Sequence, residues 1–225
     1  MDLIKAIVKR RSIRNFKDKK IEKDDLLFLC ELGMKAPSSG NLQDFRFIVS
    51  NDKKIINKLP AMCMDQSWIR KAGGLIVVCS QPEMQIKWFG ENGRWFATQN
   101  AAAAAQNILL GAQKLGLGAT WVSGFDKEKI NDLFDIPKNA RVEMIILIGY
   151  PQGKPEPKEE NAIDVMVYFD SFGNDKADLL SYKKDYSEKL ERFIEDQSEK
   201  SKTLGEKIKQ LKENTITNIK KTIKK

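Results

Sequence analysis

The sequence predicts a sandwich of the α+β or α/β class, in which helices cover both faces of a central sheet. Two observations lead to this fold class. Segments with helical spacing of apolar residues alternate along the chain with short apolar runs that are typical of strands. One of these runs, Gly74–Ser80, is almost continuously apolar, as expected for a strand buried on both faces of a sheet. A chain of 225 residues, 41% of them hydrophobic, can form one domain with a sizeable core.

Two helices and a strand are predicted in the first part of the chain. Asp2–Lys9 carries its apolar residues on one side. Asp24–Lys35 is predicted to be helical and to end before Pro37, because proline disfavours helical backbone in the residue that precedes it. The basic connection Arg10–Lys20 joins these helices, and Phe45–Ser50 is predicted as a strand.

The middle of the chain contains the longest predicted helix. After a helix at Asp52–Leu59 and the apolar strand, the Ala-rich segment Trp95–Leu115 is expected to be helical and to stop at Gly116 and Gly118. Trp95–Gln113 carries no charge, but its Asn and Gln side chains are too polar for a lipid-facing helix. We therefore expect a helix that is buried in a soluble core or a subunit interface.

The compact body is expected to end with a strand, a helix and a further strand. Ala119–Ser123 is predicted as a strand, Asp126–Phe134 as a helix with Asp126 as its N-cap, and Val142–Tyr150 as the last strand. Three prolines and a glycine in Tyr150–Pro157 then indicate the end of the body.

The basic character of the chain is concentrated in a C-terminal extension. We predict a main domain at residues 1–180 and a basic amphipathic helical extension at 181–225. The net charge is +8, and residues 183–225 hold 13 Lys and Arg against 8 Asp and Glu, or +5. The extension could pack on a homodimer, form a self-contained helix, or offer a basic surface. Interspersed glutamates and the lack of interleaved aromatic residues argue against nucleic acid, and neither nucleic acid nor membrane is an expected partner. The apolar stripe that favours a helix consists of Leu190, Ile194, Leu204, Ile208 and Leu211.

The cysteine and histidine content argues against a metal site. Cys30, Cys63 and Cys79 form no CxxC pair, and the chain has no histidine, so no metal is expected. Scattered cysteines favour reduced thiols in a cytoplasmic protein. Basic residues interrupt the first apolar stretch, so no signal peptide is expected either.

The first candidate site lies just after the first predicted helix. Arg10, Ser12 and Arg14 place three donors within five residues, and alternate residues of an extended segment share one side. A guanidinium offers a rigid donor fork that suits phosphate oxygens. A solvated basic turn is the alternative interpretation.

A second candidate is the polar loop Pro37–Gln43, which is rich in hydroxyl and amide groups. Such a loop can hydrogen-bond the edge of a planar ring, and Gly40 allows close approach. An ordinary turn between helix and strand is the alternative.

The third candidate is Gly116–Phe125. It lacks the third glycine and the preceding strand of a dinucleotide fingerprint. What remains is a strand that ends at Ser123 and Gly124, where backbone N–H groups are free to donate to a ligand.

Taken together and in this order, these motifs resemble the FMN-dependent nitroreductase family over about residues 1–160. The similarity rests on KRRSIRNF at Lys9–Phe16, APSSGNLQDFRFIV at Ala36–Val49, the Ala-rich helix, GLGATWVSGF at Gly116–Phe125 and ILIGYPQGKPEPK at Ile146–Lys158. The resemblance implies an α-β-α sandwich of the α+β class with a central mixed, mainly antiparallel sheet. It also implies an intertwined homodimer with its active sites at the subunit interface.

The resemblance also implies roles for individual residues. Arg10, Ser12 and Arg14 would bind the phosphate and ribityl part of FMN, and the Pro37–Gln43 loop would line the flavin from the partner subunit. Backbone N–H groups near the end of the strand would face the flavin N5, and Lys158, with Lys154 as its rival, would complete the phosphate site. The residues implied to contact FMN are Arg10, Arg11, Ser12, Arg14, Pro37, Ser38, Ser39, Asn41, Gln43, Trp121, Val122, Ser123, Gly124 and Lys158.

The chain departs from the family pattern in three places. Asp44 and Phe45 stand where relatives often have Pro-Trp, and this carboxylate could alter substrate preference or simply face solvent. Ser123 occupies a position that is acidic in many relatives. Met62–Arg94 matches nothing specific. Its aromatic residues could form a substrate lid or fill gaps at a dimer interface: Trp68, Trp88 and Phe89.

The resemblance therefore predicts a cytoplasmic, homodimeric FMN oxidoreductase. Hydride would pass from NADH or NADPH through flavin N5 to a small planar acceptor such as a nitroaromatic or a quinone. Because the flavin performs the redox chemistry, no catalytic histidine is needed. The alternatives are a family member with another reaction, either flavin destruction or reductive dehalogenation, and a non-enzymatic flavin-binding scaffold that recruits a partner through its tail.

Overall fold

The computed structural model describes residues 3–155, 161 and 165–174. The chain divides into two units, and the first, residues 6–157, holds the whole described sheet. In the second unit, the backbone N–H of Phe169 donates to the carbonyl oxygen of Asn174 at 3.3 Å and closes a short turn. The predicted extension at 181–225 lies outside the described residues.

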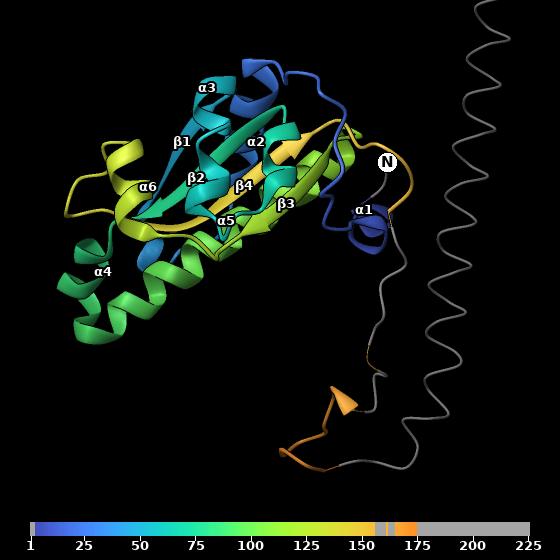
Figure 1. Ribbon diagram of the computed structural model, residues 1–225. Coiled ribbons are helices and arrows are strands. Elements are labelled where there is room, and N and C mark those ends of the chain that lie inside the picture. Colours follow the sequence, from blue (N-terminus) through green and yellow to red (C-terminus); the bar gives the residue numbers. More distant parts are fainter. Residues whose placement is uncertain (1–2, 156–160, 162–164, 175–225) are drawn as a thin grey trace, which may run out of the picture. The chain divides into compact units, whose positions relative to one another are not determined.

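Helices and strands alternate along the described chain (Figure 1). The strands are β1 (Phe45–Ser50), β2 (Gly74–Ser80), β3 (Gly118–Val122) and β4 (Arg141–Gly149). The α-helices are α1 (Leu3–Lys9), α2 (Lys23–Met34), α3 (Lys53–Ile56), α4 (Pro82–Phe89), α5 (Gly93–Lys114) and α6 (Lys127–Leu133). Short 3-10 helices are η1 (Ser39–Asn41), η2 (Leu59–Met62), η3 (Ser67–Lys71) and η4 (Gly90–Asn92).

The four strands form one antiparallel sheet in the order β1-β2-β4-β3. The parallel pairing found in the described residues is a bridge between Ser12 and Ala119 of β3. Ser12 thereby adds to the β3 edge of the sheet. The predicted fold class, an α+β sandwich with a mainly antiparallel sheet, is confirmed.

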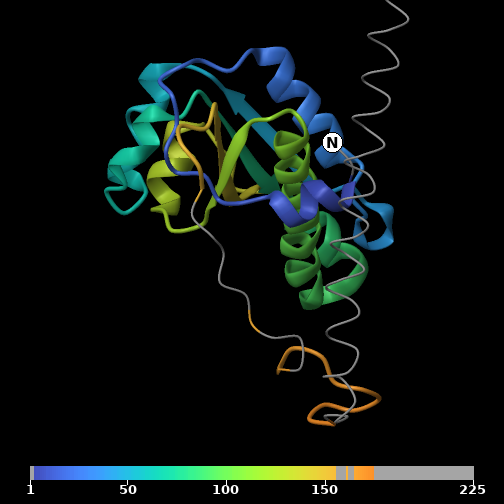
Figure 2. The same ribbon diagram turned by 90° about the vertical axis from the view of Figure 1, so that its right-hand side faces the viewer.

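Helices pack on both faces of the sheet because alternate strand residues point to opposite sides. On one face, Leu26 of α2 and Ile108 of α5 belong to a core with Ile76 of β2. On the other face, Ile56 of α3 belongs to a second core with Val77 of the same strand. Figure 2 shows the sheet lying between these two layers. All seven residues of β2 are buried, in agreement with its apolar sequence.

The long helix α5 is buried largely within its own chain. It packs on α2, α4 and the sheet, so its lack of charge does not by itself require a second subunit. None of the helices in the described part of the chain is long and apolar enough to span a membrane. The buried positions of α5 are Gly93, Ala97, Asn100, Ala101, Ala104, Ala105, Ile108, Leu109, Gly111 and Ala112.

One predicted helix is shorter than expected. The helix predicted at Asp52–Leu59 is confined to α3, where Asp52 caps the N-terminus by accepting a hydrogen bond from the backbone N–H of Lys54 at 2.8 Å. Pro60 contributes to the early end, because a proline has no backbone N–H and its ring would clash with the carbonyl of Ile56 if an α-helix continued through it. The chain continues as the 3-10 helix η2 instead.

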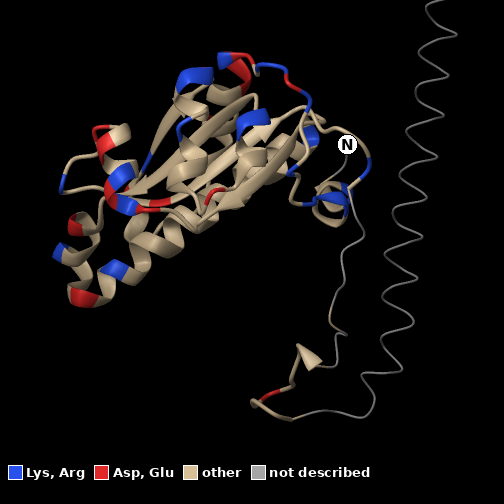
Figure 3. Ribbon diagram, viewed as in Figure 1, with Lys and Arg blue, Asp and Glu red and all other residues tan. Residues whose placement is uncertain are grey.

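Charged residues are sparse in the middle of the sheet and more frequent on helices and loops around it (Figure 3). Glu143 is a charged residue of β4 with an almost fully buried side chain, and it accepts a hydrogen bond from the hydroxyl of Ser80 at 2.6 Å. Apart from such buried polar contacts, the space between the sheet and its helices is filled by apolar side chains.

Candidate functional site

The basic segment after α1 lies in an extended conformation along the β3 edge of the sheet. The backbone N–H of Ile13 donates to the carbonyl oxygen of Ala119 at 3.1 Å, next to the Ser12 bridge. Ile13 packs into the second core, whereas Ser12 and Arg14 are exposed. Because alternate side chains of an extended segment share a side, the donors of Ser12 and Arg14 face solvent together.

Two glycines allow this segment to lie close to the sheet. Gly118 of β3 and Gly149 of β4 are paired in register. A β-carbon at Gly118 would lie 2.8 Å from Ile13, and one at Gly149 would lie 2.7 Å from the ring of Phe16. Phe16 is fully buried. The glycines thus allow Ile13 and Phe16 to pack closely, and these two residues fix the backbone on either side of Arg14.

The chain that follows β4 returns to the same segment. The backbone N–H of Gln152 donates to the carbonyl oxygen of Asn15 at 2.9 Å. Lys154 is exposed two residues further on, so this rival for the phosphate site follows closely on the basic segment. Lys158 lies outside the described residues.

Arg11 makes contacts that differ from those of its neighbours. Its guanidinium donates to the carbonyl oxygens of Val8 at 2.8 Å and Arg10 at 2.9 Å. These contacts satisfy backbone groups at the C-terminus of α1, where a cation is favourable. Among the described residues, none accepts a hydrogen bond from the side chain of Arg10 or Arg14. Arg10 and Arg14 are therefore better placed than Arg11 to bind an anion.

The Pro37–Gln43 loop contains an unusual run of left-handed backbone. Gly40, Asn41 and Gln43 have φ values of 60°, 55° and 48°. The hydroxyl of Ser38 accepts a hydrogen bond from the backbone N–H of Gln43 at 3.0 Å and closes the loop. Pro37, Asn41 and Gln43 are exposed, so the loop presents a proline and two amide side chains to solvent.

Asp44, directly after this loop, does not face solvent. It is 0% exposed. Its Oδ1 accepts hydrogen bonds from Nδ2 of Asn100 at 2.7 Å and from Nε2 of Gln85 at 3.0 Å. The solvent-facing alternative for this carboxylate is therefore wrong.

The residues after β3 present backbone donors, and the hydroxyl of Ser123 is held by Trp121. The hydroxyl of Ser123 accepts a hydrogen bond from the indole N–H of Trp121 at 2.6 Å, and Val122 is buried in the second core. Ser123 and Gly124 are exposed, and no described residue accepts a hydrogen bond from their backbone N–H groups. Met64 lies over Gly124, where a β-carbon would be 2.7 Å from its sulfur.

The three aromatic residues that could form a lid lie in two different places. Trp68 packs in the second core, with its ring 6.5 Å from that of Phe16. Phe89 lies against the polar loop, 3.2 Å from the position of a β-carbon on Gly40. Trp88, its neighbour on α4, is 71% exposed. Trp68 fills the core of its own chain, and Phe89 contacts the polar loop.

A single chain does not bring the polar loop and the basic segment together. The loop precedes β1 and the basic segment pairs with β3, and these strands are opposite edges of the sheet, about 14 Å apart for three interstrand spacings. The loop is also tied to Asn100, which is 14 residues, or about 21 Å along α5, from Lys114 near the start of β3.

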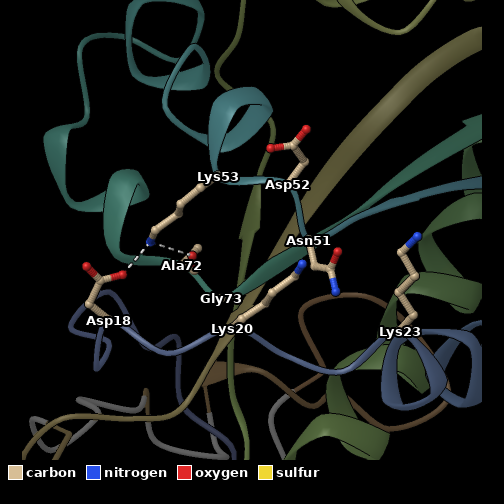
Figure 4. A pocket seen from close by; sticks show the side chains of 8 residues that line it. All are labelled: Asp18, Lys20, Lys23, Asn51, Asp52, Lys53, Ala72 and Gly73. Carbon is tan, nitrogen blue, oxygen red and sulfur yellow. Dashed lines mark hydrogen bonds and ion pairs between the residues drawn. The ribbon is translucent and has the colours of Figure 1, made fainter.

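A cavity of about 570 Å³ is lined by residues that are not among the predicted site residues (Figure 4). Within it, the ammonium group of Lys53 lies 2.6 Å from Oδ1 of Asp18 and donates to the carbonyl oxygen of Arg70 at 2.7 Å. The ammonium group of Lys53 lowers the pKa of Asp18, first through its hydrogen bond to the Asp18 carboxylate and second through its positive charge. The lining residues are Asp18, Lys20, Lys23, Asn51, Asp52, Lys53, Ala72 and Gly73.

Fold and site together define an α+β sandwich with a basic segment on one sheet edge and a polar loop on the other. A model of the nitroreductase family matches residues 7–73 and 61–150. A relative from Archaeoglobus fulgidus, provisionally named NADH dehydrogenase/NAD(P)H nitroreductase, is 31% identical over 159 residues, which cover 69% of this chain and 88% of the relative.

Solved structures give the same result. A nitroreductase family protein from Clostridium difficile 630 is 28% identical, with a TM-score of 0.67 over 76% of this chain and 100% of the other. The NADPH:FMN oxidoreductase from Vibrio harveyi, solved in complex with NAD+, is 22% identical, with a TM-score of 0.69 over 84% of this chain and 85% of the other, and shows a shared fold.

The chain belongs to the nitroreductase family. The predicted family, fold class and enzyme class are confirmed. Sequence reasoning missed α4 and the buried contacts of Asp44, which connect the polar loop to two helices.

Proposed function

We propose that this protein is an FMN-dependent oxidoreductase that oxidises NADH or NADPH and reduces a small planar acceptor such as a nitroaromatic or a quinone. When bound, FMN would supply the hydride and electron transfer chemistry. The relative from Archaeoglobus fulgidus and the structure from Vibrio harveyi carry names of this reaction class, which supports the proposal.

The observation that carries the proposal is the seating of the basic segment. Arg10, Ser12 and Arg14 supply two guanidinium groups and a hydroxyl, which suit the oxygens of a phosphate monoester. Ile13 and Phe16 are packed against Gly118 and Gly149, so the backbone around Ser12 and Arg14 is already ordered before an anion binds. Lys154 and Lys158 are the candidates for a further cation at this site.

The end of β3 fits the polar edge of a flavin ring. Ser123 and Gly124 are exposed and directly follow β3, whose last residue Val122 pairs with Ile145 of β4, so their backbone N–H groups are held close to the ordered sheet. Trp121 holds the hydroxyl of Ser123, and we infer that the backbone, not this side chain, faces the ring. On this basis the replacement of an acidic residue by serine leaves the donor intact.

We further propose that the complete site forms between two copies of the chain. The polar loop is on the opposite sheet edge from the basic segment, so the loop of a second copy would have to line a flavin held by the first. Exposed apolar side chains on α2 and at the start of α5 offer surface for such a homodimer. They are Leu27, Phe28, Met34 and Trp95.

Anaerobic spectroscopy tests the proposed reaction. Addition of NADH or NADPH to the FMN-loaded protein should bleach the absorption of the oxidised flavin, and a nitroaromatic or a quinone should then restore it. A protein that binds FMN but is bleached by neither nucleotide would contradict the proposed reaction. Such a result would favour a different reaction or a scaffold role.

A further inference from the structure

We propose that Asp44 is a positioning residue that holds the Pro37–Gln43 loop and helix α4 in one fixed arrangement. For flavin binding, this inference rests on the proposed function, because the loop is the part expected to line the flavin. For the arrangement itself, it rests on contacts within the described chain.

Asp44 is the centre of a buried polar cluster formed by distant parts of the chain. Its Oδ1 accepts from Nδ2 of Asn100 on α5 at 2.7 Å and from Nε2 of Gln85 on α4 at 3.0 Å. Its carbonyl oxygen accepts from the backbone N–H of Gln81, just before α4, at 2.8 Å. All three side chains are buried, and Asp44 and Gln85 are 0% exposed. One carboxylate therefore joins the start of β1 to two helices.

The same two amides also hold the polar loop. Oδ1 of Asn100 accepts a hydrogen bond from the backbone N–H of Ser39 at 3.0 Å, and Nε2 of Gln85 lies 3.4 Å from the carbonyl oxygen of Ser39. Several residues of the loop have left-handed backbone, a conformation that persists only where surrounding contacts hold it in place. Asp44 orients both amides, so it stabilises the loop through them.

The cluster also positions Phe89 of helix α4 against the loop. Gln85 places α4 beside Ser39, and Phe89, one turn further on, packs against Gly40 and, edge to face at 5.2 Å, against Phe96. The close approach of α4 and α5 depends on Gly93, where a β-carbon would lie 2.4 Å from the backbone of Gln85. Any movement of Gln85 therefore moves the aromatic cover of the loop as well.

Two oxygens in the cluster have no donor. Oδ2 of Asp44 and Oε1 of Gln85 are buried and unpaired among the described residues. In Asp44→Asn, one oxygen can still accept from both amides, and an –NH2 group replaces the unpaired Oδ2, so this variant should preserve the arrangement. Asp44→Ala removes the acceptor and leaves both amides without their partner. The pair of variants separates hydrogen-bond geometry from negative charge.

Glu143 offers a matched control. It is a second buried carboxylate, and it accepts hydrogen bonds from Ser80 at 2.6 Å and from Thr98 at 3.3 Å. In the described structure it has no hydrogen bond to the polar loop. Glu143→Ala should thus lower the free energy of unfolding while leaving the loop unaffected.

The experiment measures amide hydrogen exchange of the FMN-free full-length protein and, separately, its dissociation constant for FMN. Asp44→Ala should speed exchange at the backbone N–H groups of Ser39 and Gln43 by roughly tenfold or more and weaken FMN binding by roughly tenfold. Asp44→Asn should stay within about threefold of the unchanged protein in both measurements. Glu143→Ala should leave both unchanged. If Asp44→Ala does not fold, Gln85→Met takes its place, with the same direction of change.

Two results would overturn the inference. In one, Asp44→Ala behaves like Glu143→Ala and does not change exchange at the loop. In the other, Asp44→Asn is as damaging as Asp44→Ala, which would assign the effect to charge. If the unchanged protein takes up no FMN, the proposed function fails, whereas the exchange measurements still test the role of Asp44 in the fold.

Discussion

Replacing Arg14 and Arg11 separately by alanine should affect two different properties of the protein. Arg14 is exposed beside Ser12 on the solvent side of the basic segment, whereas Arg11 donates to Val8 and Arg10 at the end of α1. The two residues have the same charge and lie three positions apart. A purely electrostatic attraction of the phosphate would make them nearly equivalent, and the structure makes them different.

The expected magnitudes follow from these contacts. Loss of a charge-assisted contact to phosphate costs about 1.5–3 kcal/mol, so Arg14→Ala should weaken FMN binding about 10- to 150-fold. Arg11→Ala removes two hydrogen bonds to carbonyl oxygens and a favourable charge at a helix C-terminus. It should lower the free energy of unfolding by about 0.5–1.5 kcal/mol, or roughly 1–6 °C in Tm.

Flavin titration and thermal unfolding of the FMN-free proteins measure the two effects. Arg14→Ala should alter the dissociation constant with little change in Tm, and Arg11→Ala should do the reverse. Equal losses of FMN affinity in both variants would refute the geometry of the segment.

Three further predictions concern packing, thiol chemistry and the C-terminal extension. Gly149→Ala should destabilise the protein by about 1–3 kcal/mol in urea unfolding, because the new β-carbon would lie 2.7 Å from the buried ring of Phe16, and an unchanged midpoint would contradict this packing. Burial raises the pKa of Cys79 to about 12 and that of the other two thiols to about 11, so a thiol reagent at pH 8 should label all three slowly until the protein is unfolded. Thiols in the unfolded protein lose their protons at lower pH than the buried thiols, so the free energy of unfolding should fall as pH rises from 9.0 towards 11. Fast labelling of the folded protein would contradict the burial of these thiols. Deletion of residues 185–225 should leave FMN uptake and NAD(P)H oxidation intact while lowering dimer stability, because every residue proposed to hold FMN precedes it; loss of turnover with FMN still bound would place the extension at the active site.

The sequence predicted the sheet well because its signals are local. The strand Gly74–Ser80 agrees with β2 at both ends, and Asp126 caps α6 as expected. Helix α4 was missed because it has only eight residues, and because its buried residue is the polar Gln85 whereas its large apolar residues Trp88 and Phe89 are exposed. Pro82 at its first turn was the available signal.

In the candidate site too, features with a local sequence signal were predicted and features that depend on distant contacts were not. Alternation along an extended segment predicted that Ser12 and Arg14 share a side. The contacts of Asp44 were not accessible from sequence, because its partners Gln85 and Asn100 lie 41 and 56 residues away. Only tertiary packing brings these polar groups together, and neither the spacing nor the composition of the sequence records it.

Identification of the bound flavin shows whether this protein uses FMN. The purified protein is denatured, and the released cofactor is identified by mass and quantified against the protein; an FMN-free sample is titrated with FMN and FAD. We predict FMN, with about one molecule per chain at saturation, because the donors of Arg10, Ser12 and Arg14 suit a terminal phosphate and the chain has no dinucleotide fingerprint. Release of FAD, or failure of the FMN-free protein to take up any flavin, would contradict it.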